Sequence, residues 1–308
     1  MNPQPQVIAA GLRFPEGPVA LADGSVLLVE IERQTLSRVA PDGTVTVVAE
    51  TGGGPNGAAL GPDGRCYLCN NGGFVWHESG ERLVPGLSGA EYSGGRLQVV
   101  DLADGAVTTL YTDSDRGPLN GPNDIVFDAE GGFWFSDLGK IRERDMDRGY
   151  IGYARTDGSE CRQVIRGLVT PNGVGLSPDG KTLYAAETLT GRLWSWPVVA
   201  PGKVAFDRAS AAPSRGSLMF TPAAFQEFDS LAVDGAGNVC VATLHNGGIT
   251  VVAPDGGSAR HLPMPDPATT NICFGGPDLA TAYITLSSTG QLVSVPWPEG
   301  GLALHWRG

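Results

Sequence analysis

The sequence is poor in positively charged residues. It has 21 Lys and Arg against 33 Asp and Glu, which gives a net charge of −12 over 308 residues. Proteins that bind nucleic acid carry a basic face, and proteins that dock on anionic lipid carry clusters of Lys and Arg. We therefore expect neither a nucleic acid nor a membrane as a partner.

Long apolar runs are also missing. No stretch reaches the 18 apolar residues typical of a transmembrane helix, and residues 1–6 are not a basic region followed by an apolar run. We therefore expect no membrane span and no signal peptide. The few cysteines are widely spread and odd in number, which is typical of reduced thiols in a cytoplasmic protein. They are Cys66, Cys69, Cys161, Cys240 and Cys273.

The C-x-x-C spacing of Cys66 and Cys69 can indicate a redox or zinc site. Both residues lie in an apolar run typical of a strand, where residues three apart face opposite ways. The chain has no second such pair, so we interpret them as structural thiols.

Several catalytic and structural patterns are missing. There is no G-x-S-x-G, which leaves a serine hydrolase unsupported, and there is no glycine-rich phosphate loop. Apolar residues do not recur with period 3.6 over windows above about ten residues, whereas period 2 recurs throughout. The 45 Gly and 23 Pro are scattered between short apolar runs. This pattern predicts many short strands joined by turns.

What the chain does have is a repeat of one short pattern. A polar residue is followed by a short apolar strand, a turn rich in Asp and Gly, and a second apolar strand that ends on a polar residue 14 or 15 positions later. The six repeats begin at Glu16, Asn56, Asn123, Asn172, Asp229 and Asn271. Their second strands end at Glu30, Asn70, Asp137, Glu187, Thr243 and Thr285.

The repeats start 40, 67, 49, 57 and 42 residues apart. Propeller blades are about 40–50 residues long and have four strands each. The sequence therefore predicts an all-β fold, a six-bladed β-propeller that forms one domain over residues 1–308. We expect loop insertions near 77–122 and 197–227, an exposed loop over the charged stretch 138–150, and pairing of an N-terminal strand near 7–12 with the last blade.

The six repeat-starting residues should share one end of the central channel, because the first strand of each blade lines it. Two carboxylates and four amides without a basic residue would be costly to bury. A hard cation would resolve this, and oxygen donors of this kind suit Ca²⁺ best. Mn²⁺, Fe²⁺ and Mg²⁺ stay open, and Zn²⁺ is less favoured because the ring has no Cys or His. The alternative is that Asn-Gly and Asp-Gly only form blade corners.

The segments FPEGPVAL, GPNDIVFD, TPNGVGLSPDG and FDSLAVDGAGN resemble the gluconolactonase/regucalcin (senescence marker protein-like) family, and more distantly diisopropylfluorophosphatase. The resemblance covers roughly residues 7–295. It implies a six-bladed propeller with a central metal-binding channel. It also implies Glu16, Asn172 and Asp229 as metal ligands and Asn123 as a further ligand or substrate contact.

The resemblance further implies that Asp229 is the catalytic base or nucleophile. Two departures concern specificity. The chain has Phe228-Asp229-Ser230 where the family usually has Pro-Asp-Gly, and it lacks the substrate-binding Arg that animal members have just before the third motif. As possible substrate contacts we take Asn56, Asn123, Asn271, Glu187 and His245. Glu30 and Asp137, with Glu187, are expected to flank the mouth.

The resulting hypothesis is a metal-dependent lactonase, a carboxylic ester hydrolase that opens a sugar-type or related lactone ring. One alternative is an aryl ester or phosphotriester hydrolase on the same metal site, because a cation stabilises developing oxyanions on carbon or phosphorus alike. The other is a propeller that binds calcium or a ligand without catalysis. A small-molecule lactone or ester is the expected partner, and nothing in the sequence predicts an oligomeric state.

Overall fold

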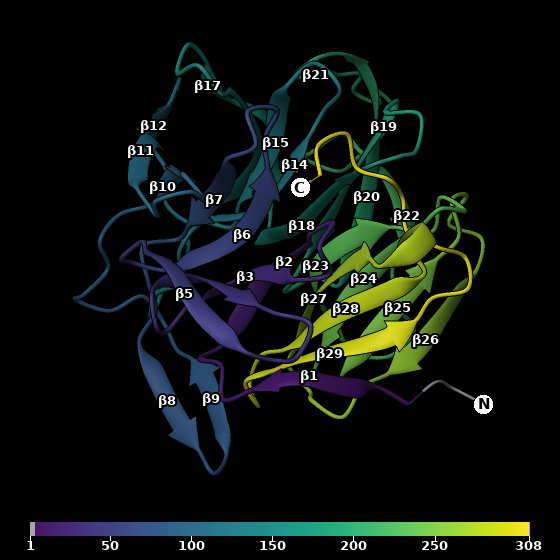
Figure 1. Cartoon of the computed structure of the whole chain (residues 1–308). Coiled ribbons are helices and arrows are strands. Elements are labelled where there is room, and N and C mark those ends of the chain that lie inside the picture. Colours follow the sequence, from purple (N-terminus) through teal and green to yellow (C-terminus); the bar gives the residue numbers. More distant parts are fainter. Residues whose placement is uncertain (1–3, 308) are drawn as a thin grey trace.

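Six antiparallel sheets surround a common centre in the computed structural model, which describes residues 4–307 (Figure 1). The chain is an all-β six-bladed propeller, as predicted. Blade 1 contains β2 (Pro15–Ala20), β3 (Val26–Glu30), β4 (Thr35–Val39) and β5 (Val45–Glu50). Blade 2 contains β6 (Pro55–Leu60), β7 (Cys66–Asn70), β10 (Arg96–Val100) and β11 (Val107–Tyr111). Blade 3 contains β14 (Pro122–Phe127), β15 (Gly132–Asp137), β16 (Gly149–Arg155) and β17 (Cys161–Leu168).

The second half of the chain repeats this arrangement. Blade 4 contains β18 (Pro171–Leu176), β19 (Thr182–Glu187), β20 (Arg192–Ala200) and β22 (Ser217–Phe220), with the short β21 (Lys203–Val204) also paired to β20. Blade 5 contains β23 (Glu227–Val233), β24 (Val239–Leu244), β25 (Gly248–Val252) and β26 (Ala259–Pro263). Blade 6 contains β27 (Thr269–Gly275), β28 (Thr281–Leu286), β29 (Gln291–Pro296) and, as its outermost strand, β1 (Gln6–Ala10).

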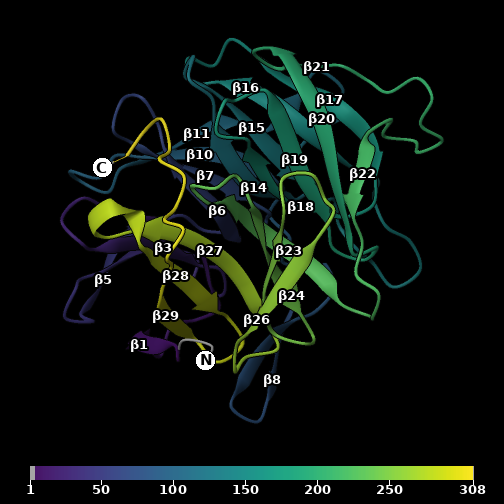
Figure 2. The same ribbon diagram turned by 90° about the vertical axis from the view of Figure 1, so that its right-hand side faces the viewer.

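The N-terminal strand therefore closes the ring, which confirms its predicted pairing with the last blade. Residues of β1 pair with β29 from Gln6 opposite Ser294 to Ala10 opposite Gln291. Figures 1 and 2 both show β1 beside β29. Closure gives blade 6 its fourth strand, so the C-terminal strand is not left as an open edge.

The hairpin turns form where Asp and Gly follow the inner strands. Gly64 and Gly180 have φ of +74° and +68°, a conformation that suits glycine. The Asp of the turn fixes its backbone. In blade 3, for example, Asp128 Oδ1 accepts the backbone N–H groups of Glu130 and Gly132 at 2.9 and 3.0 Å. These turns return each chain segment to the next strand of the same blade.

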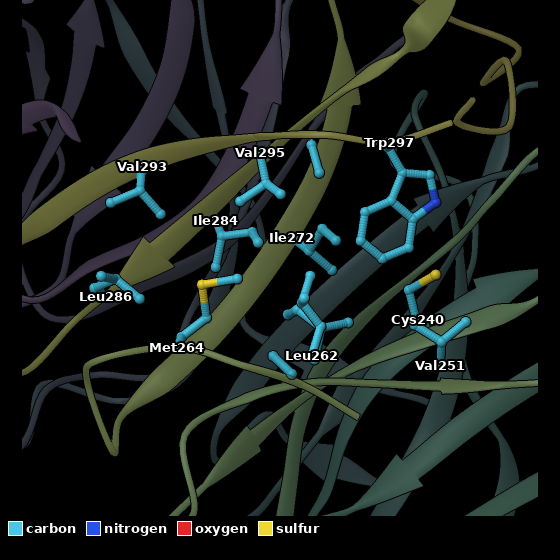
Figure 3. Close-up of a cluster of buried hydrophobic side chains, with 13 residues drawn as sticks. Cys240, Val251, Leu262, Met264, Ile272, Ile284, Leu286, Val293, Val295 and Trp297 are labelled. Carbon is cyan, nitrogen blue, oxygen red and sulfur yellow. The ribbon is translucent and has the colours of Figure 1, made fainter. Parts of the chain in front are cut away.

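The blades are held together by apolar side chains between neighbouring sheets. Figure 3 shows one such cluster, in which side chains of blades 5 and 6 point toward one another. Cys66 and Cys69 lie in β7, both buried as free thiols, which confirms the expected strand. Burial raises the pKa of the Cys66 thiol to about 12, so this thiol is a poor nucleophile.

The predicted insertions are short additional elements. A hairpin of β8 (Trp76–Ser79) and β9 (Arg82–Pro85) and the two-residue strands β12 (Asp113–Ser114) and β13 (Gly117–Pro118) fall in the longest spacing. The charged stretch 138–150 is exposed only in its middle, so the expected loop is partly wrong: Lys140 is buried and Gly149 already begins β16. Within residues 4–307 the one helix is the short η1 (Pro277–Leu279), and no helix there is long and apolar enough to cross a membrane.

Candidate functional site

The repeat-starting residues come together at one end of the channel, here called the ring end. Each occupies the second or third position of the inner strand of its blade, and all six are buried, with exposed fractions of 2–8 %. The inner strands contact one another in order around the channel. The ring comprises Glu16, Asn56, Asn123, Asn172, Asp229 and Asn271.

Glycines next to the ring explain how closely the blades approach. An added Cβ on Gly17 would lie 2.5 Å from the backbone oxygen of Asn56, and one on Gly57 would lie 2.4 Å from that of Asn123. The glycine after each of these ring residues therefore lets the backbones of neighbouring blades approach closely. Across the closure, Asn271 Nδ2 donates to Glu16 Oε2 at 2.8 Å.

A β-bulge or register shift occurs at the ring in every blade. In β14 regular pairing breaks between Pro122 and Ile125, and the five other inner strands break at the equivalent place. Bulges redirect side chains and are common beside active sites. In blade 3 the bulge brings Asp124, the residue after ring member Asn123, to the channel as well.

Three buried carboxylates thus lie around the channel: Glu16, Asp124 and Asp229. Burial, and next the charge of Glu16, raise the pKa of Asp229 well above its usual value. Burial likewise raises the pKa of Glu16, against hydrogen bonds from Asn271 and Thr270. For Asp124, burial raises the pKa to about 7. None of the ion pairs within the described chain includes these three groups, so no basic side chain offsets their negative charge when they ionise.

The amides of the ring differ in their bonding. Asn172 Nδ2 donates to Thr188 Oγ1 at 3.2 Å, and its Oδ1 accepts from Ser230 Oγ at 3.3 Å. Asn271 uses its Oδ1 to accept the backbone N–H of Ile272 at 2.8 Å. Asn123 Oδ1, in contrast, is buried without a hydrogen-bond partner among residues 4–307.

This donor set fits a hard cation. A partnerless amide oxygen and two negative carboxylates are the ligand types that Ca²⁺ prefers, and a cation would offset the charge that the residues leave unbalanced. Within the part of the chain described, no three His, Cys, Asp or Glu side chains are placed to share a metal ion. A metal held here must therefore use amide oxygens, and the predicted ligands Glu16, Asn123, Asn172 and Asp229 include two such amides.

Three further carboxylates, expected to flank the mouth, lie at the ends of second strands: Glu30, Asp137 and Glu187. Each is buried and accepts a backbone N–H from the segment that leads into the inner strand of its own blade. Both oxygens of Glu187 are occupied, by Val169 N at 2.6 Å and by side chains of Thr190 and Trp194 at 2.6 and 3.0 Å. These carboxylates brace their blades, and a contact of Glu187 with substrate stays a prediction.

His245 lies in the turn after β24, next to Leu244, which pairs with Glu227 at the start of β23. Its Nε2 is 3.2 Å from Glu227 Oε2, and its ring centroid is 5.1 Å from that of Phe225. More than half of the side chain is exposed. The structure therefore places His245 at the surface near the ring end, outside the ring, and its role with substrate stays a prediction.

Sequence reasoning missed Asp124 and several hydroxyls. Asp124 Oδ1 accepts Ile125 N at 2.9 Å and Oδ2 accepts Val174 N at 3.2 Å, so it joins blades 3 and 4. Ser136 Oγ connects the same blades, because it donates to Asn172 O at 2.5 Å. The third residue of the Pro-Asn-Asp triplet was the signal for Asp124, but strict alternation along a strand predicts that it faces away from the channel.

Beyond the ring the channel continues as an apolar cavity of about 140 Å³. Asp124 and Asn271 line its ring end, and most of the other lining side chains are apolar, with polar atoms from Ser177, His305 and Arg307. The segment 302–307 closes the far end: Leu302 N bonds to Val233 O at 3.1 Å, and Trp306 Nε1 bonds to Asp128 O at 3.1 Å.

Comparison with known proteins places these features in context. The sequence model of the SMP-30/Gluconolactonase/LRE-like region matches residues 14–288. A lactonase, Drp35, of Staphylococcus saprophyticus is 29 % identical over 266 residues, which span 86 % of this chain and 74 % of the relative. A gluconolactonase of Zymomonas mobilis is 26 % identical over 300 residues, spanning 88 % and 75 %.

Two further proteins are similar to this chain. A diisopropyl-fluorophosphatase of Loligo vulgaris is 28 % identical over 201 residues, which cover 61 % of each chain. Among solved structures, a calcium-binding protein of Agrobacterium tumefaciens, regucalcin, superposes with a TM-score of 0.72 at 18 % identity, covering 98 % of both chains. At that identity the superposition shows the propeller fold alone.

Proposed function

The chain belongs to the SMP-30/gluconolactonase/LRE-like family, and on that basis we propose that it opens a sugar-type or related lactone ring with the help of one divalent cation. Membership supports a lactonase or gluconolactonase type of hydrolase, and relatives of this chain are named for that activity. The metal, the ring residues and the class of lactone are our proposal. Ca²⁺ is the first candidate, followed by Mn²⁺, Fe²⁺, Mg²⁺ and Zn²⁺.

The observation that carries the proposal is the partnerless Oδ1 of Asn123 in a ring that also contains buried Glu16 and Asp229. The expected ligands are these three residues and Asn172. When bound, the cation would polarise the lactone carbonyl and stabilise the negative charge that develops on its oxygen. The same four residues keep the reacting atoms away from bulk water, because all are buried.

Asp229 is the proposed general base. It takes a proton from a water molecule as the water oxygen attacks the carbonyl carbon, and the ring C–O bond then breaks. The proton passes from Asp229 to the departing ring oxygen, so the product is a hydroxy acid. Burial makes the carboxylate of Asp229 more basic than one in solvent.

The test is hydrolysis of glucono-δ-lactone and a panel of aldonolactones by chelator-treated protein, before and after each cation is restored. We expect activity to return with one or a few cations, Ca²⁺ first, and Asp229→Asn to lose at least a hundredfold in kcat. Acid release at constant pH measures the opening. Full lactonase activity in the chelated protein would exclude the metal, and full activity in Asp229→Asn would exclude that residue as the base.

A second candidate is hydrolysis of phosphotriesters or aryl esters at the same site. The similarity to the diisopropyl-fluorophosphatase favours it. A fluorophosphate and an aryl acetate, assayed beside the lactones, separate the two chemistries by their relative kcat/KM. Cation binding with no turnover of any substrate would instead indicate a propeller that binds calcium or a ligand without catalysis.

A further inference from the structure

Two buried side-chain atoms in the described chain have no hydrogen-bond partner: Asn123 Oδ1 and Asn71 Nδ2. Buried polar groups are paired in nearly all cases, so each of these atoms needs an explanation. The oxygen of Asn123 suits a cation. The nitrogen of Asn71 cannot, because an amide N–H donates a hydrogen bond and therefore requires an acceptor oxygen.

Asn71 occupies the position that in blade 4 contacts the ring. It directly follows β7, and its backbone N–H bonds to Gly54 O at 2.8 Å. In blade 4 the equivalent bond joins Thr188 N to Thr170 O at 3.0 Å. The side chain of Thr188 reaches ring member Asn172, at 3.2 Å. Asn71 is thus the blade 2 counterpart of a residue in direct contact with the ring.

The orientation of the Asn71 amide is fixed by its other atom. Asn71 Oδ1 accepts the backbone N–H of Gly73 at 2.8 Å. A flipped amide would place its NH₂ group against that N–H, so Nδ2 must be the free end. Gly54 leaves room for this arrangement, because a Cβ there would lie 2.4 Å from Asn71 Oδ1.

The turn that carries Asn71 is clamped from blade 3. Lys140 Nζ donates to Gly73 O at 2.9 Å and lies 4.3 Å from the centre of the Phe74 ring and 5.0 Å from that of Tyr92. Lys140 is only 3 % exposed. The bond from Lys140 holds Gly73, and Gly73 in turn holds the Oδ1 of Asn71. The NH₂ group of Asn71 is therefore positioned before any ligand arrives.

We propose that Asn71 Nδ2 donates a hydrogen bond to a hydroxyl or ring oxygen of the bound lactone and so selects hydroxylated lactones over unsubstituted ones. The inference rests on the proposed function and adds a specificity residue to it. A buried donor left without an acceptor penalises a ligand that lacks the oxygen. Asn71 acts on substrate only, and the cation keeps its own ligands.

The test compares glucono-δ-lactone with δ-valerolactone, which has no hydroxyl groups. The variants are Asn71→Asp, which keeps the acceptor to Gly73 but loses the donor, and Asn71→Ala. We expect the kcat/KM ratio of the hydroxylated to the plain lactone to fall about three- to tenfold in both, chiefly through KM. The matched control is Asn246→Ala, an exposed asparagine in a turn of blade 5, which should leave the ratio unchanged.

Cation affinity, measured by calorimetric titration of Asn71→Ala, should stay within about twofold of the unchanged protein, since an alanine removes no cation ligand. An unchanged ratio in both variants would mean that only solvent satisfies the donor. An equal loss on both lactones would mean a structural role. Either result overturns the inference and leaves the lactonase standing, whereas no opening of any lactone by the unchanged protein removes both.

Discussion

Glu16 and Glu30 are buried carboxylates of the same blade with different surroundings. Glu16 Oε2 accepts from Gly17 N at 2.9 Å and from Asn271 Nδ2, and no basic side chain among residues 4–307 pairs with it. Glu30 accepts from Arg13 N at 2.8 Å and Ser37 Oγ at 2.7 Å, and it pairs with Arg33 at 2.8 Å. Glu16 thus lacks a compensating positive charge, whereas Glu30 has both a positive partner and hydrogen bonds. Substituting each in turn therefore separates a role in cation binding from a role in stability.

We expect Glu16→Gln to weaken divalent-cation binding at least tenfold, because the ring loses one of its negative ligands. Glu30→Gln should leave cation affinity and lactone turnover unchanged. It should lower the free energy of unfolding by about 2 kcal/mol, since an amide cannot replace a carboxylate toward three donors. Calorimetric titration measures the first effect and denaturant unfolding the second.

The pair also serves as its own control. If Glu30→Gln weakens cation binding as much as Glu16→Gln does, the cation site has been assigned to the wrong set of carboxylates. If Glu16→Gln binds the cation normally, Glu16 is not a ligand.

At the scale of single residues, the six ring positions could be predicted because a repeat marks the same place in every blade. The position of Asp124 could not be predicted, because it depends on a β-bulge that has no signal in the sequence. The role of Asn71 could not be predicted either. Its importance lies in an unpaired nitrogen, and pairing is decided by contacts with Gly73 and Gly54 that no spacing reveals.

Among the elements, the inner strands were predicted best from the sequence. Asp-Gly turns and apolar alternation determine where each strand begins and ends. The β8–β9 hairpin is different, because its place depends on distant loops: Leu83 N bonds to Ser288 O in blade 6, and Ser88 N to Ile141 O in blade 3. Contacts between residues so distant in sequence leave no local sequence pattern. The existence of the insertion could therefore be predicted, but its position in the fold could not.

The strand β1 offers a prediction at this scale. Removing residues 1–10 should lower Tm by roughly 5–10 °C, because it uncovers apolar side chains of blade 6 that β1 covers, together with the loss of buried Ala9. The edge of β29 would then be exposed, and we expect concentration-dependent association of chains. Thermal unfolding and size-exclusion chromatography at several concentrations measure these two effects.

The control for that deletion removes residues 1–5 only and leaves β1 in place. It should melt like the unchanged protein and elute at the same volume. A shortened chain without β1 that melts at the original temperature would show that the closing strand contributes little to stability.

For the whole molecule, the buried carboxylates predict an unusual dependence of stability on pH. Burial raises the pKa of Asp124 to about 7, against about 4 in the unfolded chain. Between these values the folded protein keeps a proton that the unfolded chain releases, so stability falls as pH rises. The loss is absent below pH 4, complete above pH 7, and on the order of 4 kcal/mol for this group alone.

Chelated protein should therefore melt at a higher temperature at pH 5 than at pH 8. A cation should raise Tm more at pH 8, where the carboxylates are charged and attract it. Asp124→Asn should show a smaller difference between the two pH values, since asparagine does not titrate there. Equal melting of the chelated protein at pH 5 and 8 would contradict the shift.

The hydrogen bond between Asn271 and Glu16 joins residues 255 positions apart. During synthesis, at about 5–20 residues per second, Glu16 is added to the chain roughly 13–50 s before Asn271. Blade 6 also combines β1 with β27, β28 and β29. The oxygen ring therefore cannot assemble before blade 6 has been made, and a chain released before that point would carry Asp229 and Glu16 without the strand between them. Such a fragment should have none of the activity, so catalytic competence arises only once blade 6 is present.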